Sequence, residues 1–220
     1  KNSLKQAKNN LETAEEKKKW SHEQTAITRR NGSSIEILNL LENYEIGKLD
    51  INRIYRYIEK YIKENNISNV EVVYEPVLQW QKLGILDNFY KDIKRWSYTF
   101  QNIAFITKMM ELDKLKDDII YIIERSPMTD KNCFAQLCFE NGFMSNMEWE
   151  LYNLWYDHYL PKYSTPKGYI YLKSNPITCL ERINMRKRDE ESTISIEYLE
   201  KLNTKHKKWL FSRSDTLEIN

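Results

Sequence analysis

Hydrophobic positions along the chain fall into two kinds of pattern. Three short runs are apolar at nearly every position, at 70–74, 119–124 and 168–173. Such runs are typical of strands that are buried on both faces. Longer segments repeat their apolar residues at helical spacing, at 97–112, 131–160, 176–188 and 195–210. Strands that alternate with helices predict an α/β fold, with a parallel sheet in three layers and helices on both faces.

The first third of the chain is helical in pattern. Residues 1–19 are rich in charge with a thin apolar stripe, which indicates a solvated or frayed helix. Apolar residues from Ile35 to Leu41 predict a helix that begins near Ser33. Asp50 is placed to cap another helix, which Asn65 and Asn66 end.

Two further segments lie in the last part of the chain. Residues 215–220 are compatible with a last strand, and residues 191–194 are predicted to be a mobile polar connection between helices.

Composition and charge limit the class of protein. With 220 residues, of which 41% are hydrophobic, the chain can bury the core of one domain. The 34 Lys and Arg residues against 32 Asp and Glu residues leave a net charge of +2, so we expect no nucleic-acid partner. No apolar run approaches 18 residues, and the N-terminus lacks the pattern of a signal peptide. We therefore expect no membrane association and a cytoplasmic location.

Cysteine and histidine residues give no metal-site pattern. The residues are Cys133, Cys138, Cys179, His22, His158 and His206. Their spacing matches no CxxC or zinc-ligand motif. The cysteines are expected to be core thiols in a reducing compartment.

Charged residues follow two of the predicted strands. The first strand runs into Glu75, and the second runs into Glu124 and Arg125. Ligands of open parallel sheets bind at the carboxyl ends of the strands, so these residues could supply a general base and a metal or hydroxyl ligand. The alternative is that the charged residues have no functional role and follow each strand because the chain is exposed to solvent there.

A second charged cluster lies near the end of the helix predicted at 176–188. Arg182 and Arg186 share a face at i, i+4 spacing, and Arg188 follows. Several guanidinium groups in one place suit a phosphoryl group, because arginine stays ionised and grips oxygens in a fork. A solvated helix end with basic residues is the competing explanation.

Six blocks of sequence together resemble the deoxynucleoside kinase family, which holds deoxycytidine, deoxyguanosine and mitochondrial thymidine kinases. The blocks are YEPVLQW (74–80), FYKDIKRWSYTFQ (89–101), ERSPMTDKNCFA (124–135), NMEWELYNLWY (146–156), GYIYLKSNPITCLERINMRKRDEES (168–192) and YLEKLNTKHKKWL (198–210). They follow the family's order with compatible spacing over about residues 70–211. The resemblance implies a P-loop kinase-like fold, phosphorylation of a deoxynucleoside 5′-hydroxyl in nucleotide salvage, and ATP and Mg²⁺ as cofactors.

The resemblance also implies catalytic roles. Glu75, in the EPV motif, corresponds to the general base that takes the proton of the 5′-hydroxyl, and Arg125, in ERS, to its partner there. Glu124 corresponds to the acidic residue near magnesium. The lid that closes over the donor phosphates would contain Arg182, Arg186 and Arg188.

For the nucleoside, the family pattern implies a second set of residues. Trp80 and Phe134 would wall the base, and Gln101 would hydrogen-bond its edge. Tyr90 and Glu191 would hold the sugar 3′-hydroxyl.

Two further positions bear on the choice of base. Family members that favour deoxycytidine or deoxypurines carry an arginine and an aspartate that meet the base, and this chain has Lys108 and Asp130 there. Ionic complementarity is kept, although lysine lacks the planar fork of arginine. We therefore expect deoxycytidine or a deoxypurine to be preferred over thymidine.

The chain departs from the family in its donor loop. The family has GxxxxGK[ST], whose backbone N–H groups and lysine cradle the donor phosphates. Here NGSS (31–34) puts Gly32 where the lysine belongs, and Arg29 and Arg30 offer charge without the amide cradle. Residues 1–32 are thus an atypical charged segment. Residues 33–220 form the expected kinase-like domain, with a helical insertion near 46–68.

Three accounts follow from this departure. The chain is an active deoxynucleoside kinase with a divergent donor loop, or a nucleoside-binding pseudokinase that partners a competent chain. The third account is an incomplete or misread gene product. The family's interface helices imply a homodimer or a heterodimer with a related chain.

Overall fold

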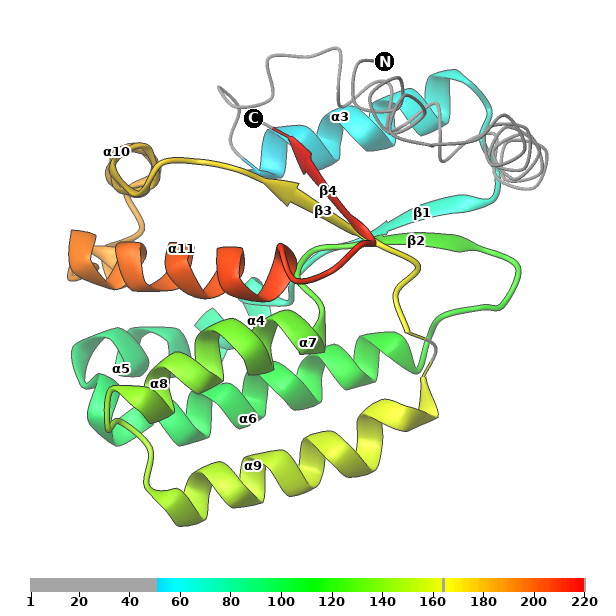
Figure 1. Cartoon of the computed structure of the whole chain (residues 1–220). Helices are drawn as coiled ribbons and strands as arrows, with labels where there is room; N and C mark the ends of the chain where they lie inside the picture. Colours follow the sequence, from blue (N-terminus) through cyan, green and yellow to red (C-terminus); the bar gives the residue numbers. More distant parts are fainter. Residues whose placement is uncertain (1–50, 164, 220) are drawn as a thin grey trace, which may run out of the picture. The chain divides into compact units, whose positions relative to one another are not determined.

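The computed structural model describes residues 51–163 and 165–219 (Figure 1). Helices and strands alternate along the chain. The longer helices are α3 (Ile51–Glu64), α5 (Ile85–Lys91), α6 (Ile93–Leu112), α9 (Asn146–Tyr159), α10 (Pro176–Arg186) and α11 (Ile196–Leu210). The short ones are α4 (Val77–Lys82), α7 (Pro127–Thr129), α8 (Gln136–Glu140), the π-helix η2 (Asp130–Ala135), and the 3₁₀ turns η3 (Leu160–Lys162) and η4 (Asp189–Glu191). The strands are β1 (Val70–Val73), β2 (Ile120–Ile123), β3 (Tyr169–Leu172) and β4 (Thr216–Ile219).

The four strands form two pairs, β1 with β2 and β3 with β4. The N–H of Ile120 donates to Asn69 O and that of Glu124 donates to Val73 O, each at 2.9 Å. The bonded partners advance together along both strands, so β1 and β2 are parallel. The three predicted strands and the predicted last strand are confirmed. The described residues do not join the two pairs into one sheet, so a single three-layer sheet stays a prediction.

Helix α3 confirms the helix predicted after Asp50, which itself lies outside the described residues. It belongs to a first compact unit, which among the described residues contains 51–72 and 118–122. Asn66 has a φ of 52°, in the left-handed region. Asparagine tolerates this conformation and commonly ends helices by it, as the sequence predicted.

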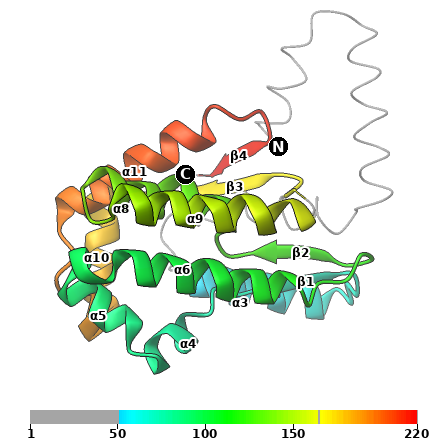
Figure 2. The ribbon, with the colours of Figure 1, turned by 90° about the horizontal axis from the view of Figure 1, so that it is seen from below.

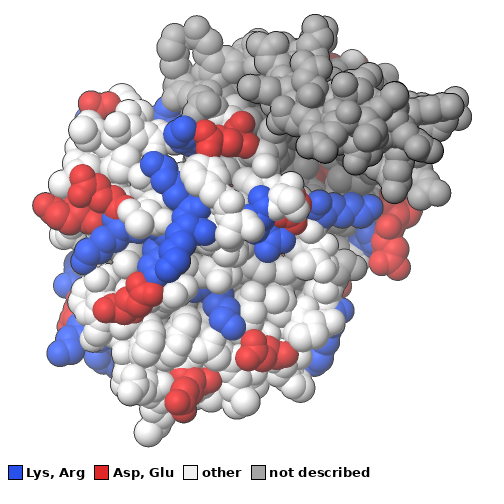
Figure 3. Space-filling view, viewed as in Figure 1, with Lys and Arg blue, Asp and Glu red and all other residues white. Residues whose placement is uncertain are grey.

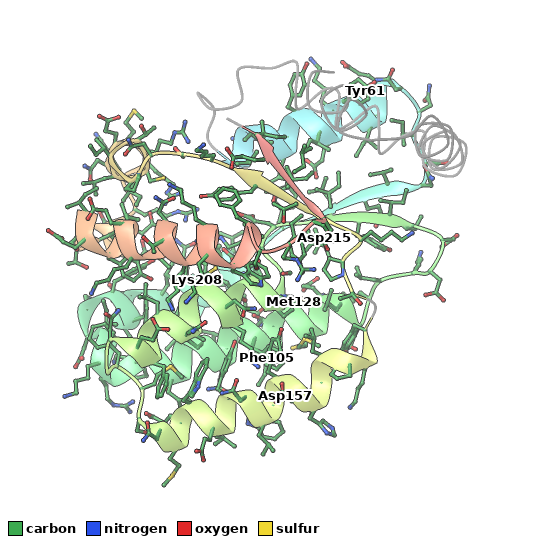
Figure 4. All side chains as sticks on the ribbon, viewed as in Figure 1. Tyr61, Phe105, Met128, Asp157, Lys208 and Asp215 are labelled. Atoms are coloured by element: carbon green, nitrogen blue, oxygen red, sulfur yellow. The ribbon has the colours of Figure 1, made fainter. Side chains whose placement is uncertain are left out.

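A second compact unit contains residues 73–117 and 123–218, and its core lies between α6 and α9. Phe105 of α6 is fully buried (labelled in Figure 4). Its ring centroid lies 6.0 Å from that of Tyr152 and 5.8 Å from that of Tyr156, both in α9. Figures 1 and 2 show α6 and α9 running side by side. Aromatic pairs at this spacing contribute beyond their buried area, so they fix the two helices together.

The single helix predicted at 131–160 is wrong, because the structure divides it. Helix α8 ends at Glu140, and Gly142 then takes a φ of 72°. Ser145 starts α9 with a capping box, in which Glu148 N–H donates to Ser145 Oγ and the Glu148 carboxylate accepts from Ser145 N–H. A left-handed glycine commonly ends a helix, and a serine in a capping box begins the next one. The apolar periodicity continues through both residues and therefore concealed the turn between the two helices.

Two other expectations are corrected in and just after α10. The helix predicted at 176–188 ends at Arg186, because Lys187 is left-handed with a φ of 52°. The connection predicted to be mobile at 191–194 is anchored. Glu191 is only 6% exposed, and Thr193 Oγ1 donates to Tyr90 O at 3.2 Å. Buried polar groups hold this segment, which its polar sequence did not indicate.

None of the helices in the described part of the chain is long and apolar enough to cross a bilayer.

Candidate functional site

The charged residues that follow β1 and β2 come together, as the strand-end argument predicted. The Arg125 guanidinium Nη1 lies 3.3 Å from Glu75 Oε2. The Glu75 N–H donates to Glu124 Oε2 at 3.3 Å. The Glu75 side chain is 4% exposed and that of Arg125 is 45% exposed. The arrangement is a buried carboxylate with a half-exposed guanidinium beside it.

Arg125 has unusual backbone geometry, since its φ is 53°. A residue other than glycine rarely takes this conformation, which costs about 1–3 kcal/mol and is found most often at functional sites. The side chain is also held against Phe134, with the guanidinium carbon 5.1 Å from the ring centroid.

Lys108 of α6 links Glu75 to Asp130. Its ammonium lies 2.9 Å from Glu75 Oε1 and 2.7 Å from Asp130 Oδ2, and it donates to Asp130 Oδ1 at 2.8 Å. All three side chains are at most 5% exposed. The predicted pairing of Lys108 with Asp130 is therefore present, and Glu75 is an additional partner.

This charge arrangement sets the protonation of the carboxylates. Burial alone would raise the pKa of Glu75, but the charges of Arg125 and Lys108 outweigh it and hold the pKa below its usual value. Burial raises the pKa of Asp130 to about 6 against the opposing charge of Lys108. Glu75 is consequently an ionised, buried carboxylate at neutral pH.

Glu124 differs from Glu75. Burial and the charge of Glu75 raise the pKa of Glu124, although Arg125 opposes them. The described residues contain no cluster of three or more His, Cys, Asp or Glu side chains suited to a metal ion.

The residues predicted to meet the base are all in this unit. Trp80 is 3% exposed, and its Nε1–H donates to Thr107 Oγ1 at 3.0 Å. Gln101 is 2% exposed, and its amide nitrogen lies 3.9 Å from Cys138 Sγ. Sulfur is a weak acceptor, so this contact is a weak one.

Two of the three arginines predicted for the lid meet at Glu191. Arg186 Nε donates to Glu191 Oε2 and Arg188 Nη1 donates to Glu191 Oε1, each at 3.1 Å. Arg182 donates to Ser174 Oγ at 3.3 Å. Burial and the charge of Glu191 raise the pKa of Tyr90 to about 12, so these two predicted sugar-binding residues are near one another.

Some residues around the site were not predicted. Gln81 Nε2 donates to Glu190 Oε1 at 3.0 Å, which ties α4 to the segment after α10. The Tyr152 hydroxyl is buried, and no hydrogen-bond partner for it is found among the described residues. Both residues occupy ordinary positions of helical patterns, so a single sequence offers no signal for them.

Comparison with known proteins decides the class of this site. A family model for deoxynucleoside kinases matches residues 58–218. A probable deoxycytidine kinase of fowlpox virus (strain NVSL) is 40% identical over 68% of this chain and 67% of its own length. The chain belongs to the deoxynucleoside kinase family. Its enzyme class is therefore that of a deoxynucleoside kinase, a phosphotransferase.

Cellular relatives of this deoxynucleoside kinase give the same assignment. Human deoxycytidine kinase is 32% identical over 86% of this chain and 80% of its own length. The mitochondrial deoxyguanosine kinase of Xenopus laevis is 27% identical over 86% of this chain and 78% of its own length.

Lys and Arg side chains are mixed with Asp and Glu over the face in Figure 3, in keeping with the small net charge.

Proposed function

We propose that this chain transfers a phosphoryl group from a nucleoside triphosphate to the 5′-hydroxyl of a deoxynucleoside, a reaction of nucleotide salvage. The observation that carries the proposal is the buried carboxylate of Glu75, held between Lys108 and Arg125 after the parallel strands β1 and β2. Phosphoryl transfer needs positioning and electrostatic stabilisation more than covalent chemistry, and this arrangement supports both.

Glu75 is the proposed general base. A carboxylate has about four lone-pair sites, and two are directed at Lys108 and Arg125. The remaining sites leave room for the 5′-hydroxyl proton of the substrate. Arg125 is half-exposed, so its other N–H groups can donate to the same hydroxyl oxygen. Proton removal by a positioned base of this kind commonly contributes about 10²–10⁴-fold in rate.

The residues present fit ATP and Mg²⁺. Magnesium usually binds through one or two carboxylates together with phosphates and water, so Glu124 alone suffices, and a cation would favour its ionised form. Arg182 and Arg186 of α10, with Arg188 just after it, are the proposed phosphate ligands of the lid. Bound ATP supplies the phosphoryl group, and Mg²⁺ neutralises part of its charge. The donor loop around Gly32, with Arg29 and Arg30, lies outside the described residues.

Asp130 supports a preference for deoxycytidine or deoxypurines. Its Oδ2 is buried, and the contact found for it among the described residues is the Lys108 ammonium at 2.7 Å, which leaves further lone-pair capacity on the carboxylate. An exocyclic amino group of cytosine, adenine or guanine would donate to this oxygen. Thymine would place a carbonyl oxygen there, and two acceptors repel each other. We propose that Trp80 and Phe134 wall this base, that Gln101 meets its edge, and that Tyr90 and Glu191 hold the 3′-hydroxyl.

Phosphorylation of a substrate panel tests the proposed function. With ATP and Mg²⁺, deoxycytidine, deoxyadenosine and deoxyguanosine should be converted, and thymidine should have a kcat/KM at least about fivefold lower, because one lost polar contact costs about 1–3 kcal/mol. Thermal unfolding with each nucleoside measures binding separately. Stabilisation by nucleosides without turnover would contradict the kinase and support the alternative, a catalytically impaired nucleoside-binding pseudokinase or dimer partner.

An apolar face on α6 and α9 supports a dimer. Its exposed residues are Ile106, Met110, Met147, Leu151, Leu154 and Trp155. Their spacing puts those of each helix on one side, and monomers rarely expose a large apolar patch. We propose that a second copy of the chain covers this face by two-fold symmetry, or a related chain in a heterodimer.

Leu154→Glu tests this face. Leu154 is 64% exposed, and a buried unpaired carboxylate in an interface is costly, so the variant should sediment as a monomer while the wild type sediments as a dimer. Ile177→Glu on α10, where the isoleucine is 58% exposed, is the matched control and should stay dimeric. A monomeric wild type would contradict the proposal.

Our expectations for the location, the domain bounds and the sheet are proposals. We place the chain in the cytoplasm, supported by three free cysteines, which suit a reducing compartment. We propose one kinase-like domain at 33–220 with a helical insertion near 46–68, and an atypical segment at 1–32. The two strand pairs are proposed to belong to one three-layer P-loop kinase sheet.

A further inference from the structure

A buried hydrogen bond joins Trp80 of α4 to Thr107 of α6. The indole Nε1–H donates to Thr107 Oγ1 at 3.0 Å. Trp80 is 3% exposed and Thr107 is 5% exposed, so water does not compete for this bond. Trp80 is the buried residue of α4, which is six residues long and has no side-chain hydrogen bond at its N-cap. A helix this short does not hold its own position in water, so the Trp80 side chain anchors it.

Thr107 is directed at the indole by the helix that carries it. Its hydroxyl donates to the carbonyl oxygen of Ile103 at 2.7 Å, and that of Ala104 lies at 3.2 Å. A hydroxyl has one proton, and the helix uses it, so its oxygen is left as an acceptor. An indole N–H is a donor only. The two groups therefore match in one direction.

The other contacts of the Trp80 ring do not select one of its edges. The Phe100 ring meets it in a T-shape with the centroids 5.4 Å apart, and the Lys108 ammonium lies 5.9 Å from its centroid. Both contacts involve the π system, which is similar on its two faces. The hydrogen bond involves the Nε1 edge, so it distinguishes this orientation from one turned by about 180° about χ2.

We infer that Thr107 is a positioning residue that acts through Trp80, fixing the orientation of the indole and with it the wall against which the nucleobase packs. The inference rests on the proposed role of Trp80 in the nucleoside site. It makes Thr107 a determinant of nucleoside affinity. Glu75 is held separately, by Lys108 and Arg125, so Thr107 should affect binding rather than the chemical step.

Thr107→Val tests the inference, because it removes the hydroxyl and keeps the shape of the side chain. The buried N–H of Trp80 then has no acceptor at this position, and the ring is no longer held in one orientation. The KM for deoxycytidine should rise about fivefold or more while kcat stays within about twofold, which is the pattern of lost uniform binding. A Val variant with the wild-type KM would overturn the inference.

Thr107→Ser is the rescue variant. Serine keeps the hydroxyl, so KM and kcat should both lie within about twofold of the wild type. A Ser variant as impaired as the Val variant would show that the methyl group matters rather than the hydrogen bond, and the inference would fail.

Thr204→Val is the matched control. Thr204 Oγ1 donates to Glu200 O at 2.9 Å on the exposed side of α11, which is the same kind of bond to the helix backbone as that of Thr107 to Ile103. Its loss should leave KM within about twofold of the wild type, as is usual for surface changes. A rise in KM equal to that of Thr107→Val would assign the effect to the helix bond and contradict the inference.

The indole N–H signal of Trp80 in NMR spectra provides a readout that needs no substrate. The chain has six tryptophans, and Trp80→Phe assigns this signal by its loss. A hydrogen-bonded N–H proton resonates downfield of a free one. The signal should therefore move upfield in Thr107→Val and keep its position in Thr107→Ser. An unmoved signal in the Val variant would mean that the bond does not hold the indole.

Calorimetric titration with deoxycytidine, without ATP, separates this inference from the proposed function. A wild type that binds deoxycytidine but transfers no phosphate would contradict the proposed function, and a higher Kd for Thr107→Val would still support the inference. An unchanged Kd would overturn the inference and leave the proposed function standing. A wild type that binds no deoxynucleoside would overturn both.

A second variant covers the case in which Thr107→Val does not fold. Combination with Trp80→Phe leaves no indole N–H to satisfy. The double variant should bind deoxycytidine as Trp80→Phe alone does, because the two residues act as one unit. A further rise in Kd in the double variant would show that Thr107 acts by another route and would overturn the inference.

Discussion

Glu75→Gln should lower kcat by about 10²–10⁴-fold, the usual contribution of a general base. Glutamine keeps the shape of the side chain, and its one amide oxygen can still accept from Lys108, whereas its NH2 group replaces the oxygen that faces Arg125. The site should therefore stay assembled with the Arg125 contact weakened. Glutamine cannot take a proton from the 5′-hydroxyl. The loss should therefore appear in kcat and in single-turnover rates, whereas deoxynucleoside binding, followed by thermal unfolding, should change little.

Glu71→Gln is the matched control for this prediction. Glu71 lies four residues earlier, in β1, and is exposed. Its substitution should leave kcat within about twofold of the wild type, because surface changes away from special features have small effects. Retention of wild-type kcat by Glu75→Gln would remove Glu75 from the reaction. Equal losses in both variants would point to general damage to the fold.

Glu191→Gln should reduce kcat/KM for deoxynucleosides by about 10–100-fold. Glu191 is 6% exposed and accepts from both Arg186 and Arg188. Its proposed bond to the 3′-hydroxyl is a hydrogen bond to a charged group, which contributes about 1.5–3 kcal/mol. The substitution weakens that bond and also releases two lid arginines from their shared partner.

A substrate without the 3′-hydroxyl separates these two effects. The wild type should strongly prefer a 2′-deoxynucleoside over the matching 2′,3′-dideoxynucleoside, and Glu191→Gln should reduce this preference by about the factor lost in kcat/KM. Glu190→Gln is the control, because Glu190 accepts from Gln81 rather than from the arginines. Equal losses on both substrates would mean that Glu191 acts through the lid alone.

The strands could be located from the sequence because their apolar runs are short and are separated by long segments of helical pattern. Sequence reasoning placed Glu75 and Arg125 at neighbouring strand ends, and the 3.3 Å contact between them agrees. It also paired Lys108 with Asp130. The first success follows from strand geometry, since parallel strands bring their carboxyl ends to one edge. The Lys108–Asp130 pair came from the resemblance to the family.

The misses also have physical causes. The helix predicted at 131–160 failed because apolar periodicity continues through Gly142 and Ser145, which end one helix and start the next. The prediction that the connection at 191–194 is mobile was wrong, because a polar sequence does not distinguish a solvated residue from one buried in an ion pair. Glu191 is buried in such a pair with Arg186. Contact between Lys108 and Glu75 joins residues far apart in sequence, and no local pattern indicates it.

The π-helix at Asp130–Ala135 has a consequence for how this segment can vary. A π-turn is an α-helix that has taken in one extra residue, and it is common at functional sites. The π-helix begins at Asp130, which pairs with Lys108, and is followed by Cys138, which is in the core. Deleting one residue would restore the α-helical repeat and turn one side by about 100° relative to the other. This segment should accept changes of residue type far more readily than changes of length.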